Sequence, residues 1–227
     1  MQNIKAHFEA EAAQFDSIIR RLIPYYEQML TALVDAIPLA PDMRFSVLDL
    51  GCGTGAVSLA ILKRFPQARI TLLDLSPKML AIARERIPQA NLSQVIESNF
   101  AEWNWPDRYD VIASSLALHH LPTEAEKAAF HDRIHAGLQT GGTFVNADVV
   151  LAGSARMQDV YLERWKQYMT RTTPIAEVET EWLPRYYAED IPASLAFHLE
   201  SLRQSGFQAV DVYWKYYNFA VFGGLKN

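Results

Sequence analysis

The sequence predicts an α/β protein built on a Rossmann-like, mostly parallel sheet of seven strands, with a C-terminal antiparallel hairpin and a helical cap. Three observations predict it. Short apolar strands alternate with helices from Phe45 onward, and a glycine-rich turn joins the first strand to its helix. Two strand-like runs at the end are joined too tightly for a helical crossover. The alternation implies parallel pairing with right-handed crossovers.

The first forty residues are predicted to form two helices. Apolar residues from Ile4 to Ile23 recur at helical spacing, and Pro24 breaks or restarts that helix. A second apolar stripe runs from Tyr26 to Ile37. These helices are expected to cover one edge of the sheet.

The regular core follows. Its strands are predicted at 46–50, 69–74, 92–97, 109–114 and 143–149, and its helices at 56–64, 77–86 and 124–138. Ser76 is placed as an N-cap, with Pro77 in the first helical position. The third helix is expected to close at Gly141-Gly142.

Beyond this core the pattern changes. We predict a helix at 154–172, an aromatic stretch at 174–187, a helix at 194–204 that stops at Gly206, and hairpin strands at 208–214 and 216–222. The whole chain, 1–227, is predicted to be one domain. Its parts are an N-terminal helical cap (1–42), a cofactor-binding core (43–150), a helical cap insertion (151–190) and the last helix with the hairpin (191–227).

Composition excludes several classes of protein. Half of the 227 residues are apolar, so a sizeable core can form, yet the longest apolar runs are too short to span a membrane. The single cysteine, Cys52, excludes an internal disulfide and a multi-cysteine metal site, and no secretory leader is evident, so we expect a cytoplasmic protein. With a net charge of −5 and no Lys/Arg cluster, we expect a small-molecule substrate and no nucleic-acid partner. The sequence does not exclude a basic patch that forms only on folding, nor does it exclude a homodimer.

The glycine-rich turn is the strongest chemical feature. Gly51, Gly53 and Gly55 stand between a strand and a helix, where glycines allow a tight bend and let a ligand approach the backbone. Asp74 ends the next strand, where a carboxylate can accept hydrogen bonds from both ribose hydroxyls. These residues alone fit a nicotinamide dinucleotide as well as S-adenosylmethionine.

Four motifs then occur in order, and together they resemble class I S-adenosylmethionine-dependent methyltransferases. They are Asp49-Leu-Gly-Cys-Gly-Thr-Gly55, Leu72-Leu-Asp-Leu-Ser-Pro-Lys-Met79, the run from Tyr109 to Leu121 that contains His119-His120, and Leu138-Gln-Thr-Gly-Gly-Thr-Phe144. The resemblance covers residues 45–150 strongly and implies S-adenosyl-L-methionine as the cofactor.

The resemblance also implies which residues bind that cofactor. The glycine loop would pass the methionine moiety with Asp49 nearby, and Asp74 would hold the ribose. Asn99 would accept from the adenine amino group, although many relatives have Asp there. The full implied set is Asp49, Gly51, Gly53, Gly55, Asp74, Leu75, Met79, Asn99, Phe100 and Ser115.

Catalytic candidates follow the fourth strand and lie in the later cap. His119 and His120 are adjacent, so on a helical turn they diverge by about 100° and one can face the pocket. Such a histidine could take a proton from an acceptor, line the site, or make only a structural hydrogen bond. Tyr186 is the third candidate. We predict no metal site, because the sequence offers no evident third ligand.

The cap is expected to bind the substrate through aromatic rings, which can face a sulfonium by cation–π contact. The alternative is that these rings only pack against one another within the cap. The substrate-binding candidates are Tyr25, Tyr26, Asn146, Tyr161, Trp165 and Ser201. The first helices and the segment 214–222 resemble the carboxy-S-adenosylmethionine synthase branch of the superfamily. That branch carries a carboxylate-binding arginine on the last helix, and our alignment places Ser201 there, which argues against that activity.

The sequence therefore predicts a methyltransferase that transfers a methyl group to a small organic acceptor by in-line displacement, a reaction that positioning alone can accelerate strongly. The alternative is non-methylating chemistry on S-adenosylmethionine. Its forms are closure of the aminobutyrate chain to azetidine-2-carboxylate with release of methylthioadenosine, or carboxy-S-adenosylmethionine synthesis. A non-catalytic binding protein and a nicotinamide enzyme are the remaining hypotheses.

Overall fold

The structure is a computed structural model that describes residue 9 and residues 11–227. The expected helical turns around Ile4 lie outside the described residues. Within the described part, no helix is long and apolar enough to cross a membrane.

Seven strands form one sheet in the order β3-β2-β1-β4-β5-β7-β6. The strands β1 to β5 pair in parallel, and β7 lies antiparallel between β5 and β6. The predicted fold class is thus confirmed. Their bounds are β1 (Ser46–Leu50), β2 (Arg69–Asp74), β3 (Leu92–Glu97), β4 (Tyr109–Ser115), β5 (Leu138–Val149), β6 (Gln208–Tyr216) and β7 (Phe219–Leu225).

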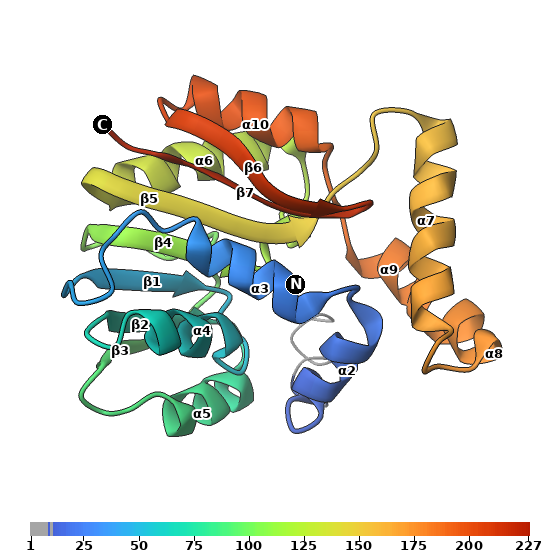
Figure 1. Cartoon of the computed structure of the whole chain (residues 1–227), viewed down its shortest axis with the longest axis horizontal. Helices are drawn as coiled ribbons and strands as arrows, with labels where there is room; N and C mark the ends of the chain where they lie inside the picture. Colours follow the sequence, from blue (N-terminus) through green and yellow to red (C-terminus); the bar gives the residue numbers. More distant parts are fainter. Residues whose placement is uncertain (1–8, 10) are drawn as a thin grey trace.

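Helices cover both faces of this sheet, and a cap lies beyond the carboxyl ends of its parallel strands. Figure 1 shows α2, α7, α8 and α9 gathered at that edge. The described helices are α2 (Phe15–Leu22), α3 (Tyr26–Asp35), α4 (Ala56–Arg64), α5 (Pro77–Arg86), η1 (Leu118–His120), α6 (Glu124–Gly137), α7 (Ala155–Met169), α8 (Ile175–Glu177), η2 (Val178–Trp182), α9 (Leu183–Glu189) and α10 (Leu195–Gln204).

Two apolar clusters form the core, one on each face of the sheet. One joins α3 and α4 to the cap through residues such as Leu33, Ile61 and Trp165. The other packs α6 and α10 through Ile134 and Leu202. The strands β1, β2, β4 and β7 are almost wholly buried, as expected for apolar strands covered on both faces, whereas the edge strands β3 and β6 are mostly exposed or half-buried.

Most predicted boundaries agree with the structure to within one or two residues. Ser76 caps α5 by accepting from the Met79 backbone N–H at 3.3 Å. The main difference is that α6 ends at Gly137 and β5 starts at Leu138, because Leu138 already pairs with Tyr109. The Gly141-Gly142 pair therefore lies within a strand, at a shift of register, and does not close a helix.

The C-terminal hairpin turns later than predicted. Its strands end at Tyr216 and resume at Phe219, and Tyr217 adopts a left-handed backbone with φ 47°. Gly223 lies opposite Val145, where a Cβ would approach the Phe144 carbonyl oxygen to 2.1 Å. This close approach leaves room only for glycine at the centre of the antiparallel part.

Candidate functional site

Two neighbouring cavities open at the carboxyl edge of the parallel strands. The loop cavity is lined by the glycine loop, the end of β2 and Tyr26. The cap cavity is lined by α2, η1 and α9. Four residues line both, and of these only His120 is polar; the other three are Phe15, Ile19 and Leu116.

The glycine loop bends sharply between β1 and α4. Gly51 has φ 65°, and a Cβ there would lie 2.5 Å from the Ala117 Cβ. Gly51 and Gly53 line the loop cavity, whereas Gly55 packs against Ala83 of α5 and does not. The glycine residues thus let the backbone form the cavity wall, as a bound nucleoside requires.

Asp74 ends β2 and lines the loop cavity. One carboxylate oxygen accepts from the Gly53 N–H and the other from the Ser76 N–H, each at 2.8 Å. Burial raises the pKa of Asp74, although these backbone hydrogen bonds oppose that effect. The carboxylate is held at the cavity wall, and its remaining acceptor capacity suits ribose hydroxyls.

Asp49 lies behind the loop, fully buried, and does not line the cavity. Its Oδ2 accepts from the Ser58 backbone at 3.1 Å and from the Ser58 hydroxyl at 2.5 Å, while Oδ1 is buried without a partner in the described part. Burial raises the pKa of Asp49 to about 7. Its position supports the loop from beneath.

The other predicted cofactor residues divide into two groups. Leu75, Met79, Phe100 and Ser115 line the loop cavity, and the buried Ser115 hydroxyl has no partner within the described residues, which suits a polar ligand. Asn99 faces a separate surface hollow, and its side-chain amide donates to Glu102 at 2.8 Å. The structure therefore does not bring Asn99 into the cavity, because its side chain closes a local turn.

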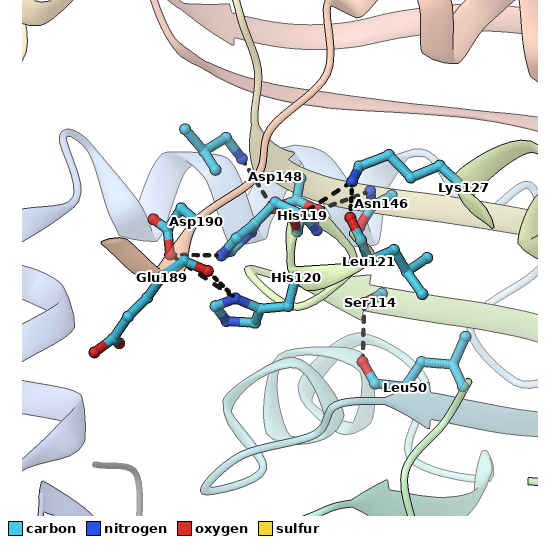
Figure 2. A network of polar contacts seen from close by, with 11 residues as sticks. Leu50, Ser114, His119, His120, Leu121, Lys127, Asn146, Asp148, Glu189 and Asp190 are labelled. Carbon is cyan, nitrogen blue, oxygen red and sulfur yellow. Dashed lines mark hydrogen bonds and ion pairs between the residues drawn. The ribbon is translucent and has the colours of Figure 1, made fainter. Parts of the chain in front are cut away.

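The two histidines have opposite protonation states. Burial would lower the pKa of His119, but Asp148 at 2.5 Å and Asp190 at 3.4 Å outweigh it and raise that pKa to about 10. The pKa of His120 falls to about 4 because the ring is buried and lies beside the His119 cation. Figure 2 shows both rings turned toward Asp190 and the Glu189 carbonyl. These contacts join the cap to the core.

Aromatic rings form the wall of the cap cavity. Trp165 donates its indole N–H to the Leu22 carbonyl at 2.8 Å and meets Tyr186 edge-on at 5.1 Å. Burial raises the pKa of the Tyr186 hydroxyl far above its usual range, so this phenol stays neutral. Trp182 completes the wall.

Charged residues that the sequence pattern did not single out also line the cap cavity. They include the carboxylates of Glu11, Glu189 and Asp190. Arg185 is the only Lys or Arg that lines either cavity in the described part, and it contacts Glu11 at 2.6 Å and Glu189 at 3.2 Å. No local signal could have identified this group, because its members lie up to 179 residues apart and meet only in the folded chain.

Four predicted substrate residues lie away from both cavities. Tyr25 packs against Tyr168 and Tyr216, and Tyr161 against Tyr217, in an outer aromatic cluster. Tyr26 and Trp165 do line the cavities.

The other two are interior residues on the sheet and its covering helix. Asn146 is buried in β5 and donates to Asp148 at 3.3 Å. Ser201 bonds the His131 ring at 2.8 Å between α10 and α6, on the far face of the sheet. The presence of serine at position 201 therefore gives no information about carboxylate binding in the cap cavity.

A sheet of this order with a glycine loop, a strand-end aspartate and a second cavity beside it defines an α/β enzyme that binds an adenosine-containing cofactor. The family described as "Methyltransferase domain" matches residues 47–142. A carboxy-S-adenosyl-L-methionine synthase from Chromohalobacter salexigens is 30% identical over 96% of this chain and 82% of its own length.

One further sequence relative and one solved structure of the same fold are similar over smaller shares of their own lengths. A malonyl-[acyl-carrier protein] O-methyltransferase from Acetivibrio thermocellus is 32% identical over 49% of this chain and 38% of its own length. Human N-acetylserotonin methyltransferase, solved with S-adenosylmethionine, has a TM-score of 0.64 at 18% identity and covers 96% of this chain and 56% of its own.

The chain belongs to the class I S-adenosylmethionine-dependent methyltransferase superfamily, and within it lies near the carboxy-S-adenosylmethionine synthase branch. It is an S-adenosylmethionine-dependent transferase, and S-adenosyl-L-methionine is its cofactor.

Proposed function

We propose that this chain uses S-adenosylmethionine as the substrate of a non-methylating reaction, in which the aminobutyrate chain closes to azetidine-2-carboxylate and methylthioadenosine is released. The observation that carries the proposal is the charge of the cap cavity. Three carboxylates line it against two cations, because Arg185 is held between Glu11 and Glu189 and the protonated His119 ring faces Asp190. One negative charge therefore remains on the wall. Such a cavity favours an ammonium group over a second carboxylate-bearing substrate.

The position of the cavities supports the same reaction. The loop cavity would hold the adenosine through Asp74, Leu75 and Met79, so the aminobutyrate chain would reach the cap cavity past His120. There the α-ammonium would meet carboxylates and the sulfonium would face aromatic rings, a contact worth about 0.5–2 kcal/mol. We propose Tyr186 and Trp165 as that aromatic wall.

The reaction balances without a second substrate. The α-ammonium gives one proton to a cavity carboxylate, and its nitrogen then forms a bond to Cγ. The Cγ–sulfur bond breaks, and the electron pair stays on sulfur, which leaves as the neutral thioether methylthioadenosine. Holding nitrogen in line with the Cγ–S bond is the main task of the protein, because a well-oriented intramolecular attack needs little further help.

Carboxy-S-adenosylmethionine synthesis is the second candidate. It is favoured by the match to the Chromohalobacter synthase, which spans both caps as well as the core. For that reaction Arg185 would have to leave at least one carboxylate partner to bind a carboxyl donor. Methyl transfer to a small acceptor is the third candidate reaction. The match to the methyltransferase-domain family supports it, but the methyltransferase from Acetivibrio thermocellus matches only about half of the chain.

Product analysis distinguishes the three reactions. Purified protein is incubated with S-adenosylmethionine alone, and the products are separated by liquid chromatography with mass detection. Enzyme-dependent methylthioadenosine together with azetidine-2-carboxylate is the expected result. If a carboxylated cofactor forms only with an added carboxyl donor, the reaction is carboxy-S-adenosylmethionine synthesis and the proposal is wrong. If S-adenosylhomocysteine forms only with an added acceptor, the reaction is methyl transfer and the proposal is wrong.

A further inference from the structure

The turn that carries the two histidines meets the segment 189–190 in a cluster of donor atoms. His119 Nε2 lies 3.4 Å from the Asp190 Oδ1 atom, and His120 Nδ1 lies 3.8 Å from the same oxygen. The Glu189 carbonyl oxygen is 3.2 Å from His120 Nδ1. The three side-chain donor atoms lie within 4.8 Å of one another.

These spacings match those around a small divalent ion. Metal–ligand bonds of about 2.0–2.1 Å in a tetrahedral arrangement place neighbouring ligand atoms roughly 3.3 Å apart. The His119–Asp190 and His120–Glu189 distances lie within about 0.1 Å of that edge, and the His120–Asp190 distance exceeds it by about 0.5 Å. The side-chain donor atoms as a set span up to 4.8 Å, so binding an ion would draw them closer together.

The surroundings of His119 add a second, independent observation. Its Nδ1 atom is bound by the Asp148 carboxylate at 2.5 Å, on the side of the ring away from Asp190. A carboxylate on the far nitrogen is the arrangement that orients metal-binding histidines and raises the basicity of the ligating nitrogen. Asp148 is itself fixed by the His119 and Val149 backbone N–H groups.

We propose that His119 Nε2, His120 Nδ1 and Asp190 Oδ1 form a binding site for a divalent transition-metal ion, with the Glu189 carbonyl oxygen as a fourth donor. Two imidazoles and a carboxylate favour Zn²⁺ over the hard ions Mg²⁺ and Ca²⁺. In the metal-free chain the His119 Nε2–H reaches Asp190 and the His120 Nδ1–H reaches the Glu189 carbonyl. The ion would take the place of both protons: the one on His119 is released, and the neutral His120 ring carries its proton on Nε2 instead. Figure 2 shows the cluster between η1 and the end of α9, so the ion would tie the cap to the core.

Metal titration of the full-length, tag-free protein tests the site. The protein is treated with a chelator, dialysed, and titrated with Zn²⁺ in a calorimeter and with Co²⁺ while the visible spectrum is recorded. We expect one ion per chain and a Co²⁺ spectrum typical of nitrogen and oxygen ligands in low coordination. Asp190→Asn, which keeps the size of a half-buried side chain, should weaken binding at least tenfold.

Glu189→Gln is the matched control. It removes the neighbouring carboxylate but keeps the Glu189 carbonyl, and its affinity for Zn²⁺ should stay within about threefold of the wild type. Circular dichroism verifies that both variants fold. The absence of saturable binding to the wild type, or equal affinities of the wild type and Asp190→Asn, would overturn the proposal and leave His119 as a buried cation between two carboxylates. The measurement does not depend on the proposed reaction.

Discussion

Two carboxylates on neighbouring strands, Asp49 of β1 and Asp74 of β2, have different surroundings. Asp74 lines the loop cavity and accepts from two backbone N–H groups at the cavity wall. Asp49 lies under the loop, and among the described residues it is bonded only by Ser58, on one of its oxygens. We therefore expect substitutions of the two residues to change different properties.

Replacing Asp74 should impair cofactor binding. Asp74→Asn removes the negative charge that would bind the ribose hydroxyls, and charge-assisted hydrogen bonds contribute about 1.5–3 kcal/mol each. The dissociation constant for S-adenosylmethionine should rise at least about tenfold by calorimetry. Glu97→Gln, in register with Asp74 on β3, is the control and should change it little. A folded Asp74→Asn protein with wild-type affinity would show that Asp74 does not hold the ribose.

Replacing Asp49 should change the pH dependence of stability. Its pKa is about 7 in the folded chain against an ordinary 3.8, so the folded state keeps this proton at pH values where the unfolded state has lost it. The contribution of Asp49 to the free energy of unfolding therefore falls as pH rises from about 4 to about 7, and stays low above that. Asp49→Asn removes this dependence.

The size of this effect follows from the shift. Three pKa units correspond to about 4 kcal/mol as an upper bound. Urea unfolding of wild type and Asp49→Asn, without ligand, should give a difference in free energy that grows in favour of the variant between pH 5 and pH 8. A difference that is the same at both pH values would mean that Asp49 is ionised in both states.

At the scale of elements, the sequence predicted a boundary well where the residues that determine it lie within one segment. Ser76 and Pro77 define the start of α5, and short continuous apolar runs define β1 and β2. The start of β5 was missed because Leu138 joins the sheet through its pairing with Tyr109, which no pattern within 138–142 indicates. Tertiary pairing decided that boundary.

The contact between α6 and α10 gives a prediction at this scale. Ser201→Ala removes the hydrogen bond to the buried His131 ring, which would leave a polar nitrogen without its partner. We expect the free energy of unfolding to fall by about 1–3 kcal/mol in urea titrations. Ser205→Ala, at the end of the same helix, should cost less.

Cofactor affinity provides the second measurement on the same variant. Because Ser201 lies between α10 and α6 and lines neither cavity, the dissociation constant for S-adenosylmethionine should match that of the wild type. If affinity or turnover dropped sharply while stability was unchanged, Ser201 would belong to the site after all.

The whole molecule carries a net charge of −5, and in the cap cavity the carboxylates outnumber the cations three to two. S-adenosylmethionine is cationic, so raising NaCl from 20 to 500 mM should weaken its binding roughly two- to fivefold through screening. Neutral methylthioadenosine, which fills the same loop cavity, is the matched ligand and should bind almost independently of salt. Equal salt dependence of the two ligands in calorimetry would mean that the carboxylates do not act on the cationic aminobutyrate end of bound S-adenosylmethionine.

The sequence by itself determined the alternating core, the glycine loop, the strand-end Asp74 and the superfamily, because each depends on residues close together in the chain. Only the tertiary structure brought Glu11, Arg185 and Asp190 around one cavity and set His119 between Asp148 and Asp190. It also moved Asn99 and Ser201 away from the site. The physical reason is that charge and proton affinity in a cavity depend on burial and on neighbours from distant segments, which no local spacing encodes.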